Sequence, residues 1–154
     1  MKKVISIVIP FYNEEENVDE LYKRINQLTK VEKKYDFETI AVEHGSKDST
    51  FNKLVAINKK DKRVKILQLS KNFGNADAGI TAGLAFAKGD AAVITMADLQ
   101  EPPEMISKFL NKWEEGYDIV YGIVKNRADA PLSRKILSNL FYKVLNLIDR
   151  KSVV

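Results

Sequence analysis

A single acid closes the fourth apolar run of the chain. Residues 91–95 have the composition of a buried strand, and Asp98 follows shortly after them. A divalent cation that holds a substrate phosphate would take carboxylate oxygens at such a place. Met96, two residues before Asp98, offers only a thioether, which a hard cation does not use. Asp98 could thus contribute to such a site, whereas Met96 could not.

Other familiar chemistries have little support. His44 is the only histidine, and no nucleophile elbow is present, so a Ser-His-Asp triad is not supported. The fingerprints G-x-G-x-x-G and G-x-x-x-x-G-K-[ST] do not occur after a strand, which argues against a dinucleotide dehydrogenase and a P-loop NTPase. The chain has no cysteine, which excludes disulfides and thiolate metal sites.

Apolar runs that alternate with amphipathic segments must position these loops. Runs of this kind, separated by helices, are typical of a parallel sheet that is covered on both faces, so we predict an α/β fold with a doubly wound, mostly parallel sheet. Ligands bind such sheets at the carboxyl ends of the strands, which makes the loops after the strands the place to search. The predicted strands are residues 4–9, 37–42, 64–69, 91–95 and 119–124, and the later helices are 48–58, 75–87 and 102–115.

Four residues carry predictions about helix ends. Asn13 is expected to cap the first helix, which runs to about Leu28, because a side-chain oxygen there can accept a free backbone N–H. Asp48 is expected to cap the second helix in the same way. Gly89 is expected to end the third helix in a left-handed conformation, and Gly116 ends the fourth.

The composition favours one domain with a core, since the chain has 154 residues of which 45% are hydrophobic. The formal net charge of +4 comes from basic residues spread along the chain, so we expect a solvated surface and no nucleic-acid partner. No run reaches the roughly 18 apolar residues that span a bilayer. We expect a cytoplasmic protein, with peripheral attachment to the cytoplasmic membrane face as an alternative.

The pattern changes near residue 130. Residues 1–130 are predicted to form the domain, and residues 131–154 a basic amphipathic helix. Packing of this helix on the domain, or on a further segment, is favoured over a position in a membrane interface, which stays open. Its apolar residues are Leu132, Ile136, Leu137, Leu140, Phe141, Val144, Leu145, Leu147 and Ile148.

Four loop motifs, in this order, carry a family resemblance: IVIPFYNEEENV, AVEHGSKDST, LSKNFGNADAGITAGL and TMADLQEPPE. Together they resemble the family 2 glycosyltransferases, which have the Rossmann-like GT-A fold. The closest subgroup is the dolichyl- and polyprenyl-phosphate sugar synthases, which move a sugar from a nucleotide diphosphate to a lipid phosphate.

The resemblance implies a donor site for a UDP- or GDP-sugar and an acceptor such as polyprenyl phosphate. It also implies Mg²⁺ or Mn²⁺ on the donor diphosphate, held by Asp98 and Gln100. Whether copies of the chain form a homo-oligomer stays open. The residues that the resemblance assigns to donor binding are Pro10, Tyr12, Asn13, Glu14, Glu43, His44, Ser46 and Asp98.

Three departures from the family pattern affect metal and phosphate contacts. Glu43 and His44 replace two acids, Met96 replaces the first acid of the metal motif, and Val124 replaces an arginine. The metal site is therefore expected to be weak or absent, and no catalytic residue is assigned. Alternatives to an active transferase are a weak or inactive nucleotide-sugar-binding regulatory partner and, less favoured, a structural membrane-peripheral partner that uses residues 131–150.

Overall fold

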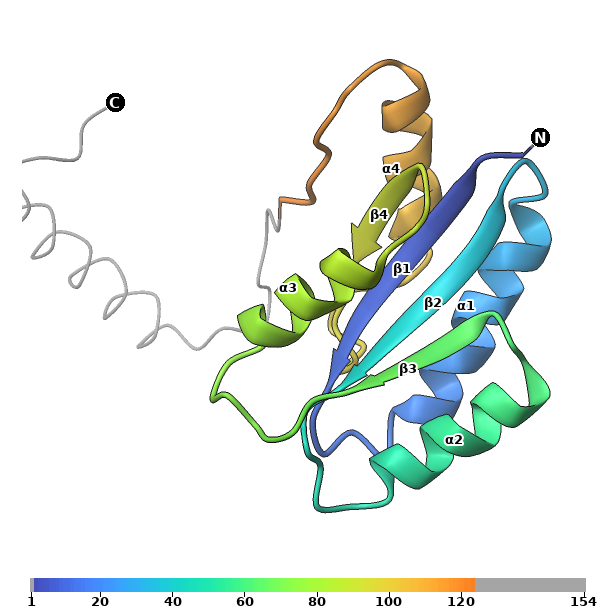
Figure 1. The fold of residues 1–154 in the computed structure, drawn as a ribbon. Coiled ribbons are helices and arrows are strands. Elements are labelled where there is room, and N and C mark those ends of the chain that lie inside the picture. Colours follow the sequence, from blue (N-terminus) through green and yellow to red (C-terminus); the bar gives the residue numbers. More distant parts are fainter. Residues whose placement is uncertain (1, 124–154) are drawn as a thin grey trace, which may run out of the picture. The chain divides into compact units, whose positions relative to one another are not determined.

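Strands and helices alternate along the part of the chain that the structure describes. The structure is a computed structural model, and it describes residues 2–123. The predicted alternation is confirmed, with bounds that differ mainly at the loops (Figure 1). The elements are β1 (Val4–Phe11), α1 (Val18–Val31), β2 (Asp36–Glu43), α2 (Thr50–Lys60), β3 (Val64–Gln68), α3 (Asp77–Phe86), β4 (Ala91–Ile94) and α4 (Met105–Glu114).

The four strands form one parallel sheet in the order β3-β2-β1-β4. The chain moves outward from β1 to β3 and then crosses back to place β4 on the other side of β1. This reversal is the defining feature of a doubly wound sheet, so the predicted fold class is confirmed. The reversal also separates the loops after β1 and β4, and such a switch point is where these sheets bind ligands.

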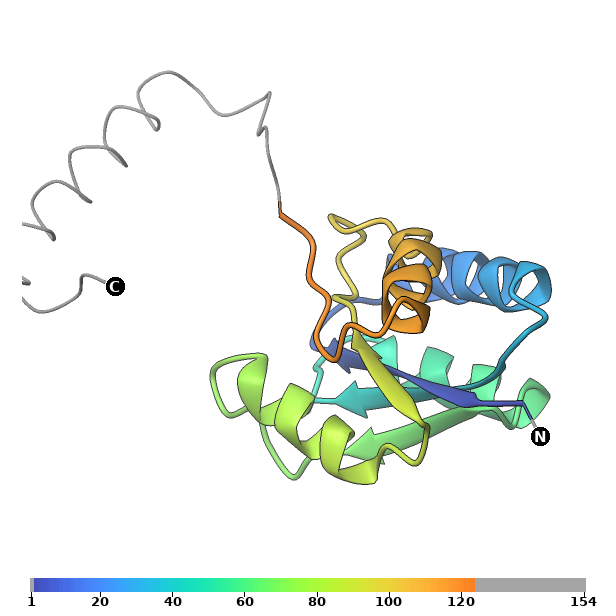
Figure 2. The ribbon, with the colours of Figure 1, turned by 90° about the horizontal axis from the view of Figure 1, so that it is seen from above.

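Apolar side chains cover both faces of the sheet. On one face, Ile5 and Ile7 of β1 belong to a core cluster with residues of α1, α2 and α4. On the other face, Val8 and Val42 form a smaller cluster, and α3 lies over it. Seen from above, α3 lies on the opposite side of the sheet from α1 and α4 (Figure 2). The alternation of side chains along β1 therefore serves two helix layers.

The first helix begins later than predicted. The α1 helix starts at Val18, and Asn17 precedes it. The prediction that Asn13 caps this helix is wrong, because Asn13 has a left-handed backbone (φ 54°) and its side-chain oxygen accepts the Lys47 N–H at 2.8 Å. A tertiary hydrogen bond to the next loop has replaced the local cap.

The glycines at the two later helix ends differ. Gly116 has a left-handed backbone (φ 97°), as predicted after α4. Gly89 is absent from the positive-φ residues, so its predicted left-handed conformation is wrong. A side chain at Gly89 would place Cβ 2.6 Å from the Val4 carbonyl oxygen. Close approach of the chain to β1, and not the turn itself, calls for glycine there.

The predicted fifth strand is not formed by residues 119–123, and Ile119 is 83% exposed. A strand needs a neighbour for its backbone hydrogen bonds, and the described strands pair only as β3-β2-β1-β4. Val124 and the predicted helix of residues 131–150 lie outside the described residues, as does the predicted domain boundary. Among the described helices, none is long and apolar enough to cross a membrane.

Candidate functional site

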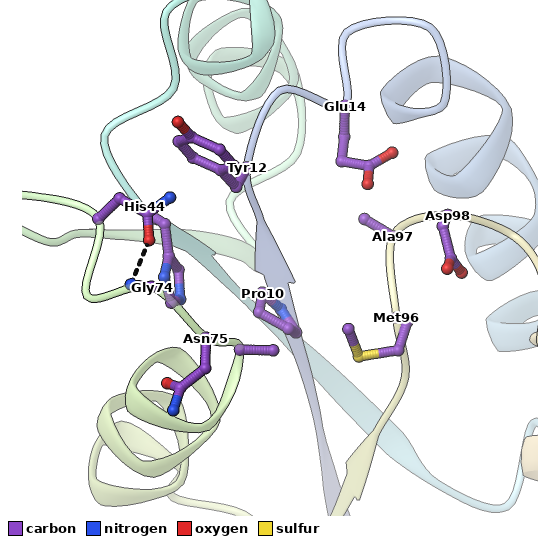
Figure 3. Close-up of a pocket in the computed structure, with 11 residues that line it drawn as sticks. Pro10, Tyr12, Glu14, His44, Gly74, Asn75, Met96, Ala97 and Asp98 are labelled. Carbon is purple, nitrogen blue, oxygen red and sulfur yellow. Dashed lines mark hydrogen bonds between the residues drawn. The ribbon is translucent and has the colours of Figure 1, made fainter.

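A pocket of about 220 Å³ lies at the carboxyl ends of the four strands, at the switch point of the sheet. All four strand-end loops contribute to it (Figure 3). The lining residues are Pro10, Tyr12 and Glu14 from the first loop, His44 from the second, Asn72, Gly74, Asn75 and Ala76 from the third, and Met96, Ala97 and Asp98 from the fourth.

Asn13 and Ser46 join the first loop to the second. The Asn13 N–H donates to the Ser46 hydroxyl at 3.0 Å, and the Lys47 N–H donates to the Asn13 side-chain oxygen at 2.8 Å. Neither Asn13 nor Ser46 lines the pocket. One bond uses the backbone N–H of Asn13 and the other its side chain, so together they tie the loop that carries Tyr12 and Glu14 to the second loop.

Asp48 strengthens the same junction. Its carboxylate accepts the N–H of Thr50, the first residue of α2, at 2.9 Å, and the N–H of Glu15 at 3.1 Å. Burial raises the pKa of Asp48, but the hydrogen bonds from Thr50 and Glu15 outweigh burial and hold the pKa below its usual value. Ser49 occupies the cap position of α2, so the prediction that Asp48 is the cap is wrong by one residue, although the Asp48 carboxylate does accept the first N–H of this helix.

Glu43 and His44 are buried side by side, with exposed fractions of 1% and 3%. One Glu43 oxygen accepts the Ser46 N–H. The other oxygen, Oε2, and the Nε2 atom of His44 are the only buried side-chain polar atoms without a hydrogen-bond partner in the described part of the chain. Such orphaned atoms are rare in folded proteins and call for an explanation. His44 lines the pocket and Glu43 does not.

The His44 ring occupies space that α3 leaves open. A Cβ on Gly79 would lie 1.7 Å from His44 Nε2, so glycine is required for the ring to lie against this helix. Burial lowers the pKa of His44, and the neighbouring Glu43 carboxylate opposes this shift only in part. The imidazole is therefore neutral at physiological pH.

The third loop turns at Gly74. This residue has a left-handed backbone (φ 87°), and its N–H donates to the Asn72 side-chain oxygen at 2.7 Å (Figure 3). The turn brings Asn75 and Ala76, which lead into α3, onto the pocket wall. The Asn-Phe-Gly motif is thus a turn.

Asp98 brings a carboxylate to the fourth side of the pocket. It is exposed, and one of its oxygens accepts the backbone N–H of Gln100 at 3.1 Å. Figure 3 shows the Glu14 carboxylate turned toward the loop that carries Asp98, with Met96 on the same wall. Gln100, predicted to bind metal with Asp98, does not line the pocket.

Comparison with known proteins agrees with this arrangement. The sequence model of the family described as "Glycosyl transferase family 2" matches residues 6–152. The chain belongs to glycosyltransferase family 2. An uncharacterized glycosyltransferase of Synechocystis is 41% identical over 142 residues, which are 92% of this chain and 44% of the relative. The bactoprenol glucosyl transferase of Shigella phage SfV is 36% identical over 97% of this chain and 48% of its own length.

Solved structures show the same fold, of the GT-A glycosyltransferase type. The mannosyltransferase PcManGT from Pyrobaculum calidifontis, solved with GDP-Man and Mn²⁺, has a TM-score of 0.64 at 22% identity and covers 95% of this chain and 39% of its own. Residues 1–349 of S. aureus TarS, solved with UDP, have a TM-score of 0.57 at 22% identity, with 82% and 40% covered. This chain thus spans less than half of the proteins compared with it here.

The charges of the pocket bear on cofactor binding. Glu14 and Asp98 are carboxylates, and no lysine or arginine is among the described lining residues. Their oxygens fit a hard divalent cation, whereas the Met96 thioether does not. No group of three or more acidic or histidine side chains able to hold a metal occurs within residues 2–123. The residues present thus fit a cation that takes its remaining ligands from elsewhere.

Each of the four strand-end loops contains one residue with a left-handed backbone. They are Asn13 (φ 54°), Gly45 (φ 77°), Gly74 (φ 87°) and Leu99 (φ 58°), and Gly116 is the only other such residue described. Glycine and asparagine are visible as turn signals in a sequence. Leucine is not, and a left-handed backbone costs it about 1–2 kcal/mol. The sequence reasoning therefore missed Leu99.

Proposed function

We propose that this chain forms the donor-binding part of a glycosyltransferase that takes a UDP- or GDP-sugar and transfers the sugar to polyprenyl phosphate or another acceptor. The observation that carries the proposal is the pocket at the switch point, to which all four motif loops contribute. The name of the related bactoprenol glucosyl transferase supports a lipid-phosphate acceptor. We also propose a peripheral position at the cytoplasmic membrane face, where such an acceptor would be reached.

The nucleoside would lie between the first two loops. Tyr12 is 39% exposed and offers an aromatic face to a base. Pro10 and Glu14 line the adjoining wall. His44 of the second loop also lines the pocket. Asn13 and Ser46 would act through the loop junction and not by direct contact.

The diphosphate would lie toward Asp98. A pocket wall with two carboxylates repels a phosphate anion, so a cation between them is needed for binding. Mg²⁺ or Mn²⁺ held by Asp98, with Gln100 nearby in the loop, would offset the charge that develops on the leaving diphosphate. Asp98 would orient the donor through this contact, and the carboxylate of Glu14 is turned toward the same loop.

A second function has one specific observation in its favour. Met96 lies on the pocket wall, where the resembling family carries an acid. With one carboxylate fewer, cation affinity falls, because hard cations bind in proportion to the charged oxygens available. The chain would then be a weak or inactive nucleotide-sugar-binding partner.

Calorimetric titration separates these functions. UDP, GDP and their sugars are titrated with Mn²⁺ and with a chelator in its place. An operating site at Asp98 predicts binding of one nucleotide that Mn²⁺ tightens at least severalfold. Nucleotide binding that Mn²⁺ does not change would contradict the proposal of an active transferase. It would favour the second function, a nucleotide-sugar-binding partner.

A Met96→Asp variant gives a matched comparison with Met96→Leu. If the pocket is a glycosyltransferase metal site that lacks one acid, the aspartate raises Mn²⁺ affinity severalfold and the leucine leaves it unchanged. Equal Mn²⁺ affinity in both variants would count against the position assigned to the metal.

A further inference from the structure

Leu99 has a backbone conformation that leucine rarely adopts. Among the described residues, only Asn13 and Leu99 combine a side chain with a positive φ. Asparagine is found there several times more often than other residues, whereas a bulky side chain at positive φ is an outlier that the surroundings must hold in place. Leu99 directly follows Asp98, which lines the pocket.

Two contacts hold this loop. The Leu99 side chain is partly buried and packs on the larger core cluster, which includes Ile106 of α4. On the other side of Asp98, Ala97 is only 2% exposed and belongs to the same cluster. The loop is therefore anchored in the core immediately before and immediately after Asp98, while Asp98 itself is exposed.

A hydrogen bond spans the left-handed residue. The Asp98 carboxylate accepts the Gln100 N–H at 3.1 Å, so one of its oxygens is tied to the loop backbone. A carboxylate that is held in this way loses little conformational freedom when it binds a cation or a ligand.

We propose that Leu99 is a positioning residue for Asp98. Its buried side chain holds the left-handed turn, and the turn keeps the Asp98 carboxylate against the pocket. The importance of this role for binding rests on the proposed function, in which Asp98 contacts the metal and donor. The geometry of the loop does not depend on the proposed function, and it can be measured without any ligand.

The test compares three variants. Leu99→Gly permits the left-handed backbone but removes the anchor, and Leu99→Met keeps an apolar anchor. Leu28→Ala removes core contacts near the end of α1. Leu28 does not line the pocket. If Leu99→Gly does not fold, Leu99→Asn takes its place, since asparagine also tolerates this backbone.

Two readouts are used, hydrogen exchange of the Gln100 amide and the affinity for UDP in the presence of Mn²⁺. We expect Leu99→Gly to speed the exchange roughly tenfold, as a local opening of the loop would, and to weaken UDP binding severalfold. Leu99→Met should keep both values near those of the parent chain. Leu28→Ala should lower the melting temperature without changing either.

Unchanged exchange and UDP affinity in Leu99→Gly would overturn the inference, because Leu99 would then be an ordinary core residue. If no chain binds UDP, including the parent, the proposed function fails. The exchange measurement still decides whether Leu99 holds the loop.

Discussion

At the scale of single residues, His44 holds a neutral imidazole in a place where a charge would be costly. The ring lies against Gly79 of α3, and its Nε2 atom has no partner. Protonation would place a charge in this buried position, with only Glu43 beside it in compensation. His44 thus contacts both the pocket and α3.

His44 predicts a pH dependence of stability. Its pKa in the folded chain lies below the unfolded value, which is about 6.5. The unfolded chain then binds more protons as the pH falls through about 6.5, so the free energy of unfolding decreases until the folded pKa is reached. Urea denaturation between about pH 7.5 and 5.5 should show this loss.

A His44→Gln variant is the matched control, because an amide does not titrate in this range. Its stability should change little over the same interval. Carboxyl groups with lowered pKa values, such as Glu38, lose their contribution only at more acidic pH and do not confuse the result. If the free energy of unfolding falls equally with pH in the parent chain and in His44→Gln, His44 is not the cause of the pH dependence.

The sequence could predict which loops make the pocket, and several of its residues. Tyr12, His44 and Asp98 line the pocket as the motifs imply. Glu43 and Gln100 do not, because spacing along a strand end places a residue in a loop but does not give the direction of its side chain. The junction between the first two loops depends on partners more than thirty residues away, which spacing along the chain does not reveal.

At the scale of elements, α3 owes its close packing to two glycines. A Cβ on Gly83 would lie 2.4 Å from a Val8 methyl and 2.9 Å from a Val42 methyl. Gly79 leaves room for His44 in the same way. Gly79 and Gly83 are thus the points of closest contact between α3 and the sheet layer.

A Gly83→Ala substitution tests this contact. Alanine improves helix propensity by up to about 1 kcal/mol, but overpacking a filled core costs about 1–3 kcal/mol. The contact at 2.4 Å makes the overpacking larger, so we expect a net loss of stability in urea denaturation.

Thr81→Ala is the control within the same helix, since Thr81 is exposed. It should be neutral or slightly stabilising, because alanine is the better helix former. A Gly83→Ala chain as stable as the parent would show that α3 does not pack on the sheet as closely as described.

The elements themselves were more predictable than their ends. The apolar runs predicted four strands correctly. The inner strands β1 and β2 are buried along nearly their whole length, as parallel strands in a covered sheet are, whereas the outer strands β3 and β4 also carry exposed residues. The start of α1 was misplaced, since Asn13 bonds across to Lys47 and not to its own helix. Residues 119–123 show the reverse error, because an apolar run forms a strand only beside a partner.

At the scale of the whole molecule, charge is distributed unevenly. The chain carries a formal net charge of +4, yet the described pocket lining has two carboxylates and no basic side chain. General attraction of anions to the protein surface therefore cannot explain specific binding of a diphosphate in the pocket. A cation, or basic residues from beyond the described part, must supply the positive charge.

In the proposed function, a nucleotide-sugar binds at the switch point through a cation on Asp98. The most direct test is the affinity for UDP with Mn²⁺ in an Asp98→Asn chain, compared with Asp36→Asn. Asp36 is an exposed acid at the amino end of β2. The pocket lies at the opposite, carboxyl ends of the strands. The two variants change the net charge equally.

We predict that Asp98→Asn weakens Mn²⁺-dependent UDP binding at least severalfold, because it removes a charged oxygen from the cation, and that Asp36→Asn leaves it unchanged. Equal UDP affinities in the two variants and the parent chain would show that Asp98 does not bind the nucleotide through a cation.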